Sequence, residues 1–171
     1  MTLPAQEQWY ALWTRSHSER LVHDQLAAQG FDVFLPMLDV WSRRSGARHA
    51  ISIPMFPGYL FLRHAMDKSS YVKVRQARGL VRVLGESWDR PATLPEIEIH
   101  AIKSVLSSRL AVMAHPFLHL GQRVRVTRGP LADVEGILVR TRSDKGLLVL
   151  SVDLLRQSVA VVVDSLDVTP A

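Results

Sequence analysis

Few residues in this sequence have the types and spacing that catalysis or metal binding needs. His115 and His119 are four apart, a spacing that on a helix would turn both imidazoles toward one metal ion. Pro116 lies between them, however, and no acidic residue nearby offers a third ligand. The chain has no cysteine, which excludes disulfides, thiolate catalysis and cysteine-based zinc sites. Phosphate-binding glycine loops and Gly-x-Ser-x-Gly sequences are also missing, so we expect neither an enzyme nor a cofactor.

The sequence SIPMFPGYLFL at 52–62 combines strand-forming residues with a stiff interruption. Two prolines restrict the backbone, and Gly58 permits a bend that a side chain would resist. We expect this bend to hold Phe56 and Tyr59 outward as anchors for a partner protein, because rigid aromatics lose little freedom on binding. The competing interpretation places the rings in the core, where an aromatic strand residue such as Phe61 is commonly found.

Basic residues are concentrated in one part of the chain. The formal net charge is +5, and residues 40–82 hold nine Lys or Arg against one acid, Asp67. That segment therefore carries +8, while the rest of the chain sums to −3. The clustering indicates an anionic partner such as a nucleic acid, although a run of charges is also a common form of solvated surface.

Hydrophobic patterning predicts the elements that would position these residues. Strands are expected at 9–13, 31–41, 49–56, 58–64 and 79–85, with a basic hairpin tip at 42–48. A capping box of Ser16 and Glu19 predicts a helix that begins there and ends near Gln29, before Gly30. Further helices are expected at 67–78 and at 93–110, the latter with Thr93 and Glu96 as its capping box.

The pattern of hydrophobic and turn residues changes near residue 111. Residues 111–118 have no clean period and contain a proline, so we expect a linker there. From residue 119 onward, short alternating runs separated by turn residues predict five strands and a small barrel. The fold class is therefore α+β: a tail at 1–8, an antiparallel sheet flanked by helices at 9–110, the linker, and an all-β domain at 119–171.

Both domains resemble known modules. The run GQRVRVTRGPLADVEGILV at 121–139 resembles the KOW motif of SH3-like barrels, with Gly136 opening the second strand. The segments WYALW, FDVFLP, PMFPGYLF, ARGLVRVLG and DRPATL occur in the order of the NGN domain of the NusG family of transcription elongation factors. Together the two resemblances cover nearly the whole chain.

The resemblance implies a function in transcription. NusG-like proteins bind the clamp helices of RNA polymerase through an apolar face of the NGN domain, and they suppress pausing or termination. Their KOW domain recruits a second factor, commonly a ribosomal protein or Rho. The alternative is a KOW-containing RNA-binding or ribosome-associated protein whose aromatic residues are core.

The resemblance also implies roles for particular residues. The polymerase-binding set lines one face or meets the gate loop: Trp9, Tyr10, Phe56, Tyr59, Phe61, Ser69 and Ser70. The nucleic-acid set faces the displaced non-template strand or upstream duplex: Arg15, Arg20, Arg43, Arg44, Arg75 and Arg78, with Arg48 at the same hairpin tip and with Trp13 and His17 as stacking partners. In the KOW domain, the partner-binding pair is Leu154 and Leu155, of which we expect at most one to be exposed.

Two further expectations concern the type of protein and its location. The compact hairpin within 34–61 resembles that of specialised, RfaH-like paralogs, and the valine-rich C-terminal half favours a barrel over a helical hairpin. The departure of LLRQSVAV from the family's glycine-rich loop argues against Rho as the KOW partner. The first ten residues lack the pattern of a secretion signal, and the aliphatic runs are too short to span a bilayer, so we expect a cytoplasmic monomer without membrane contact.

Overall fold

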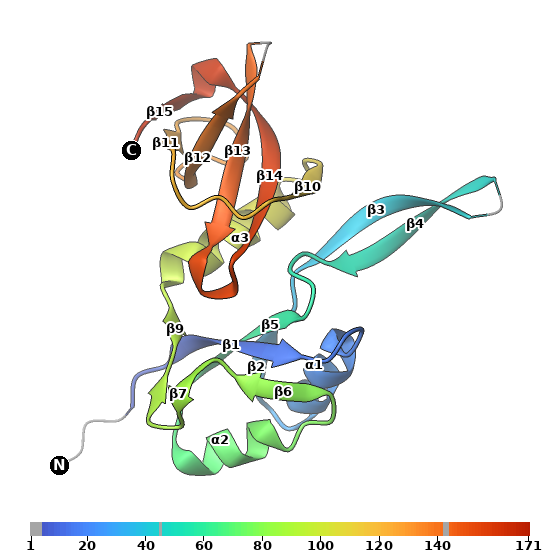
Figure 1. The fold of residues 1–171 in the computed structure, drawn as a ribbon, viewed down its shortest axis with the longest axis vertical. Helices are drawn as coiled ribbons and strands as arrows, with labels where there is room; N and C mark the ends of the chain where they lie inside the picture. Colours follow the sequence, from blue (N-terminus) through green and yellow to red (C-terminus); the bar gives the residue numbers. More distant parts are fainter. Residues whose placement is uncertain (1–4, 45, 142–143) are drawn as a thin grey trace. The chain divides into compact units, whose positions relative to one another are not determined.

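The computed structural model describes residues 5–44, 46–141 and 144–171. It divides into two compact units, Met1–Glu96 and Ile97–Ala171. The first combines a sheet with helices, and the second is dominated by antiparallel strands (Figure 1). This arrangement confirms the expected α+β class.

The sheet of the first unit is built around its N-terminal strand. Its strands run in the order β2-β5-β1-β6, and β9 also pairs with β1. Neighbours pair antiparallel, with Trp13 opposite Tyr59 and Trp9 opposite Leu94. The strand bounds are Gln8–Thr14 for β1, Asp32–Phe34 for β2, Tyr59–His64 for β5, Leu80–Val83 for β6 and Thr93–Leu94 for β9.

Two helices cover one face of this sheet. These are α1 (Glu19–Ala28) and α2 (Lys68–Arg75). Their apolar residues pack with the inward-facing residues of the strands in one cluster: Tyr10, Leu12, Val22, Leu26, Leu60, Leu62, Val74, Ala77 and Val83. Burial raises the pKa of the Tyr10 hydroxyl, as expected for a phenol in this core.

The helix starts differ from the capping boxes that the sequence predicts. Helix α1 begins after Ser18 rather than Ser16, and Ser18 makes no side-chain cap hydrogen bond. Thr93 lies in β9, paired with Tyr10, so it is not the N-cap of the next helix. Helix α2, in contrast, has a side-chain cap that neither box predicts. Asp67 Oδ1 accepts a hydrogen bond from the Ser70 amide at 2.7 Å. Both predicted boxes were wrong because their residues are used in tertiary contacts.

A long hairpin forms a separate two-stranded sheet in the first unit. Its strands are β3 (Met37–Arg44) and β4 (Ala47–Pro54), paired in continuous register from Met37–Pro54 to Arg44–Ala47. The sequence predicts one strand at 31–41, but the structure divides it into β2 and β3 around Leu35 and the buried Pro36. A second small hairpin joins β7 (Gly85–Ser87) and β8 (Arg90–Pro91).

The second unit contains a six-stranded antiparallel sheet. The strand order is β10-β14-β13-β12-β11-β15, as expected for a small barrel in place of a helical hairpin. Gly136 is required where β12 meets β13, because a Cβ there would lie 2.6 Å from the carbonyl oxygen of Val149. The bounds are Val112–His115 for β10, Gln122–Val126 for β11, Glu135–Arg140 for β12, Lys145–Val152 for β13, Gln157–Asp164 for β14 and Val168–Pro170 for β15.

The remaining elements of the second unit are helical. Helix α3 spans Glu96–Ser107, with Ile99, Ile102 and Val105 buried, and two short 3-10 helices, η1 (Asp153–Leu155) and η2 (Ser165–Asp167), flank β14. The segment expected as a linker at 111–118 includes β10, which pairs with β14 from Val112–Val161 to His115–Ser158. The division between the compact units falls between Glu96 and Ile97, at the first residue of α3 rather than after the helix.

No helix within the described ranges combines the length and the hydrophobicity that crossing a membrane would require.

Candidate functional site

An aromatic row crosses the face of the first sheet opposite α1 and α2. Side chains alternate between faces along a strand, so Trp9 and Phe61 lie on the other side from the helix-covered Tyr10 and Leu60. The row runs through ring pairs whose centroids are 6.3 Å apart for Trp9 and Phe34, 6.1 Å for Phe34 and Phe61, and 6.1 Å for Phe61 and Phe56. These edge and offset contacts are favourable geometries for aromatic pairs.

A tight turn fixes the end of this row. Phe56 and Tyr59 close it with a 3.0 Å hydrogen bond from the Tyr59 amide to the Phe56 carbonyl, and Gly58 has φ of 87°. Proline followed by a glycine with positive φ is the pattern of a type II turn. Contacts from elsewhere in the unit hold it: the Gly58 amide donates to Glu19 Oε1 at 2.8 Å, and the Thr14 amide donates to the Gly58 carbonyl at 2.8 Å. The bend expected from the sequence is therefore present and rigid.

Two expectations about the rings were wrong. Phe56 is 1% exposed and packs edge-on against Phe61, so the turn directs it inward rather than outward. Tyr10 lies in the helix-covered core, since consecutive strand residues point to opposite faces and it cannot share one with Trp9. Trp9 and Phe61 do share a face, and both are buried. The indole of Trp9 donates to Glu96 Oε2 at 2.9 Å.

The accessible end of the row lies where three strands meet. Trp13 is opposite Tyr59 on β5 and opposite Arg82 on β6, so these three side chains share the face of the row. Trp13 is 41% exposed, Tyr59 is half-buried and Arg82 is exposed. We call Trp13 and Tyr59 the exposed aromatic pair.

Two of the predicted nucleic-acid residues, Arg15 and Arg78, lie on neighbouring segments of backbone beside this pair. The Arg15 amide donates to the Gly79 carbonyl at 2.8 Å, and the backbone of Arg78 is bonded in both directions to the Gln25 side-chain amide. Arg20 is five residues before Gln25 on α1, about 140° around the helix, and so points away from Arg78. Arg15, Arg20 and Arg78 are all exposed, and none has a carboxylate partner in the part of the chain that the structure describes.

The other predicted site residues of the first unit lie on α2 and on the hairpin. Arg75 places its guanidinium 5.9 Å from the Tyr71 ring centroid. Ser69 is exposed, whereas the hydroxyl of Ser70 contacts His64 Nε2 at 2.9 Å. The backbone of the last two residues of β3 pairs with β4, but the side chains of Arg43 and Arg44 lie outside the described residues.

The predicted partner-binding pair of the second unit divides as expected. Leu155 is 4% exposed and Leu154 is half-exposed on η1, which ends at Arg156 with φ of 51°. The guanidinium of Arg156, two residues after Leu154, lies 5.1 Å from the Phe117 ring centroid. Ser151 and Ser158 hold the chain beside Phe117 by hydrogen bonds to the Leu118 backbone.

Neither histidine of the candidate metal pair lies on a helix. His115 ends strand β10 and its Nδ1 lies 2.7 Å from the Pro116 carbonyl, while His119 Nδ1 lies 3.3 Å from Asp153 Oδ1. The spacing of four residues therefore does not bring the two rings together. Among the described residues, no three His, Asp or Glu side chains gather as metal ligands.

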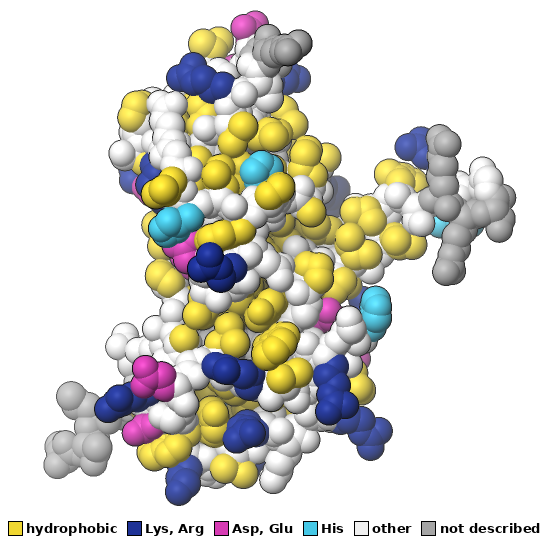
Figure 2. Space-filling view, in the orientation of Figure 1, with side chains coloured by type: hydrophobic (Ala, Val, Ile, Leu, Met, Phe, Trp, Pro, Cys, Tyr) yellow, Lys and Arg dark blue, Asp and Glu magenta, His cyan; other side chains and the backbone are white. Residues whose placement is uncertain are grey.

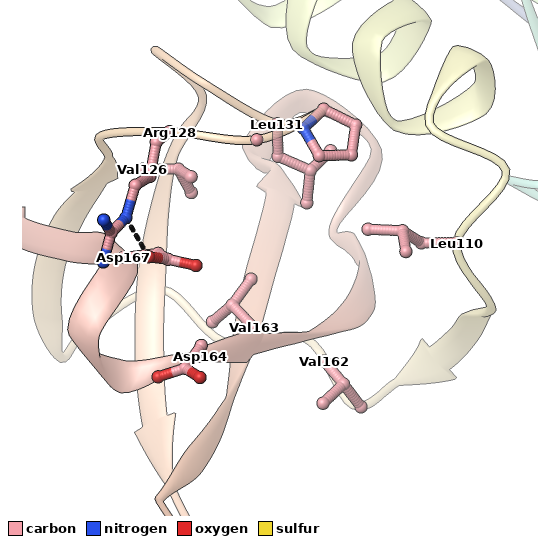
Figure 3. A pocket seen from close by; sticks show the side chains of 10 residues that line it. Leu110, Val126, Arg128, Leu131, Val162, Val163, Asp164 and Asp167 are labelled. Atoms are coloured by element: carbon pink, nitrogen blue, oxygen red, sulfur yellow. Dashed lines mark hydrogen bonds and ion pairs between the residues drawn. The ribbon is translucent and has the colours of Figure 1, made fainter.

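A small pocket opens on the second unit (Figure 3). Its volume is about 120 Å³, well below the roughly 300 to 1,000 Å³ of typical small-molecule sites. Val126, Leu131 and Val163 form its apolar wall, and an ion pair of 2.5 Å from Arg128 Nε to Asp167 Oδ1 closes one side. This pocket is too small to hold a nucleotide-sized cofactor.

Sequence reasoning missed three residues that shape these surfaces. Phe34 completes the aromatic row, Glu19 anchors the turn, and Trp41 is 69% exposed on the hairpin. The alternation of FDVF could have placed Phe34 on the face of the row. The contact of Glu19 with a turn 39 residues away carries no local signal.

Comparisons with known proteins agree with this geometry. The family model described as "Transcription termination factor nusG" matches residues 7–103, more than half of the chain. The transcription termination/antitermination protein NusG of Yersinia pestis is 29% identical over 148 residues, covering 84% of this chain and 79% of that protein. The protein of the same name from Haemophilus influenzae is 26% identical over 170 residues, covering 94% and 92%.

A solved structure has the same fold. The structure described as "Domain interaction in Thermotoga maritima NusG" superposes with a TM-score of 0.59 at 19% identity, covering 96% of this chain and 97% of that one. The family match includes β1, β2, β5 and the turn at Gly58, which together form the aromatic row and its exposed end. This chain belongs to the NusG family of transcription termination and antitermination factors.

Proposed function

We propose that this protein binds RNA polymerase through the face of the first sheet that carries the aromatic row. The observation that carries the proposal is the exposed aromatic pair: Trp13 and Tyr59 stand opposite each other at the end of a rigid row. Glu19 and Thr14 fix the turn beside them, so little conformational freedom is lost on binding. Phe56 and Phe61 support this surface from within, and Trp13 and Tyr59 contact the clamp helices.

The polymerase contact is tested by binding a clamp-helix fragment to single variants. Trp13→Ala and Tyr59→Ala each weaken binding about tenfold or more, as truncation of interface aromatics typically does. Trp88→Ala is the matched control, because Trp88 is 42% exposed and Trp13 is 41% exposed. Unchanged affinity in both test variants, with intact circular dichroism, would remove this assignment.

The second part of the proposal is contact with DNA at the polymerase. Arg15 and Arg78 lie together and carry no ion pairs within the described ranges, so both are available to phosphates. Counterion release then predicts that DNA affinity falls steeply with salt, with a slope reduced by about one for each arginine replaced. A flat salt response would remove the DNA role.

In transcription, the proposed outcome is reduced pausing or termination, as in a specialised paralog. The hairpin supports this assignment because only two residues separate β3 from β4, without an inserted segment. The assay is transcription with purified polymerase on a template that carries a termination site. Increased read-through on adding the protein is expected, and increased termination would identify a general factor instead.

The second unit is proposed to recruit another protein beside η1. Leu154 lies on η1, Arg156 ends it, and Phe117 lies under the Arg156 guanidinium, a mixed apolar and cationic composition that suits a protein partner. An RNA-binding barrel is less well supported. The arginines of β11 face carboxylates, with Arg125 Nε 3.0 Å from Glu135 Oε1 and Arg123 Nη2 3.7 Å from Glu135 Oε2.

A further inference from the structure

The two faces of the β3–β4 hairpin differ in chemistry. Opposed residues in an antiparallel pair share a face, so Val40 and Ile51 lie on one side with Leu38 and Ile53. The other side carries Trp41 opposite Ala50, and Arg48 one step further along β4. Figure 2 shows hydrophobic side chains along this hairpin, which is otherwise a thin ribbon of two strands.

Of the aromatic side chains that the structure describes, that of Trp41 is the most exposed. Its exposed fraction is 69%, against 41% for Trp13 and 42% for Trp88. The guanidinium of Arg48 lies over its ring at 5.6 Å from the centroid. The Arg48 guanidinium therefore lies against one face of the indole, and the ring remains at the surface of the hairpin.

The face of the hairpin with Trp41 carries one carboxylate and one described guanidinium. Asp39, opposite Ser52, is the next residue of this face along β3, and Arg48 is the next along β4. Arg48 is exposed, and among the described residues it has no carboxylate partner. A large planar ring beside an exposed cation is the combination that binds single-stranded nucleic acids, in which bases stack on aromatic side chains and cations neutralise the phosphates.

We infer that the face of the hairpin with Trp41 and Arg48 binds nucleic acid with unpaired bases, the indole stacking on one base and Arg48 holding its phosphate. This inference rests on the proposed function, because a protein at a transcribing polymerase meets a strand displaced from the duplex. Every base has a planar face, so the contact tolerates any sequence. A paired base within a duplex has its faces covered by its neighbours and cannot receive the indole without unstacking.

The inference is tested with the free protein and labelled DNA, without polymerase. The probes are a single strand of about 20 nucleotides, a forked duplex and a blunt duplex, measured by fluorescence anisotropy near 50 mM salt, where phosphate contacts are strong. Trp41→Ala is expected to weaken binding of the single strand and the fork at least about fivefold, since one stacked base is worth roughly five- to 150-fold. Trp41→Phe retains a ring and recovers part of the loss.

The salt dependence separates stacking from charge. Trp41→Ala leaves the slope of log K against log salt unchanged, whereas Arg48→Ala lowers it by about 0.7 on the single strand. Trp88→Ala is the control for removal of an exposed indole elsewhere in the same unit. Because both hairpin residues are exposed, these variants leave the core intact, which circular dichroism verifies.

A wild type that binds none of the three DNA probes would overturn the inference. Among the variants, three results would do so. The first is an affinity of Trp41→Ala for the single strand equal to that of the wild type. The second is an equal loss on the blunt duplex, which would make the indole a duplex contact. The third is weaker polymerase binding with unchanged DNA affinity, which would assign Trp41 to a protein partner. Loss of clamp-helix binding in Trp13→Ala is a separate readout, so failure of the proposed function is distinguishable.

Discussion

The contact between Glu19 and Gly58 predicts how strongly the turn at the end of the aromatic row is held. Glu19 is 7% exposed, and its Oε1 accepts the Gly58 amide at 2.8 Å across 39 residues of chain. Glu19→Ala removes a charged acceptor and leaves a part-buried amide without its partner. Hydrogen bonds to charged groups contribute about 1.5 to 3 kcal/mol, so we expect the free energy of unfolding of the first unit to fall by about 2 kcal/mol.

Tryptophan fluorescence during urea unfolding measures this effect in the first unit alone. All four tryptophans, at positions 9, 13, 41 and 88, precede Ile97, where the second unit begins. Glu19→Gln keeps an oxygen acceptor and should lose clearly less than Glu19→Ala. The control is Glu7→Ala, which removes an exposed carboxylate 3.3 Å from Arg63 and should change stability by less than about 0.5 kcal/mol.

Two results would refute this reasoning about the turn. One is a loss below about 0.5 kcal/mol for Glu19→Ala, which would mean that the buried hydrogen bond contributes nothing net. The other is an equal loss for Glu19→Ala and Glu19→Gln, which would assign the effect to packing of the side chain rather than to the acceptor oxygen.

Two further predictions concern single residues in each unit. Gly136→Ala forces a Cβ to within 2.6 Å of the Val149 oxygen and should destabilise the second unit by about 1 to 3 kcal/mol, measured by hydrogen exchange of β12 and β13. The amide of Ser70 lowers the pKa of Asp67 in the folded state. That stabilisation is present above the unfolded-state pKa near 3.8 and is lost as the pH falls through the lower folded value, so acid unfolding of Asp67→Asn should show a smaller pH dependence there.

One result for each variant would contradict these two predictions. Exchange of β12 and β13 that is as slow in Gly136→Ala as in the wild type would mean that the two strands do not approach as closely as the structure shows. An Asp67→Asn protein that loses stability on acidification as steeply as the wild type would assign the acid sensitivity to other carboxylates.

Local patterns in the sequence predicted most elements of the fold. The alternation in QWYALWT and YLFLRH and the helical spacing around Val22 and Leu26 are set by burial of one face, which a single sequence records directly. Strand β10 was missed because it lies at the edge of its sheet, where main-chain pairing with β14 holds it and the side chains show no alternation.

The candidate site was predicted less well, for a physical reason. The residues FPGY specify a type II turn, but they do not specify which side of the sheet receives the ring before the proline. That side is decided by Phe61, which offers Phe56 an aromatic neighbour, and by the distant carboxylate of Glu19. The spacing of Ser16 and Glu19 predicts a local capping box, whereas in the fold Glu19 holds the distant turn.

Hydrogen exchange of this protein with and without core RNA polymerase tests the proposed binding face most directly. Slower exchange is expected in the peptides that contain Trp13 and Tyr59, at the end of β1 and the start of β5, with little change in β12 and β13 of the second unit. Unchanged exchange around the exposed aromatic pair, in a complex shown to have formed, would contradict binding through this face of the sheet.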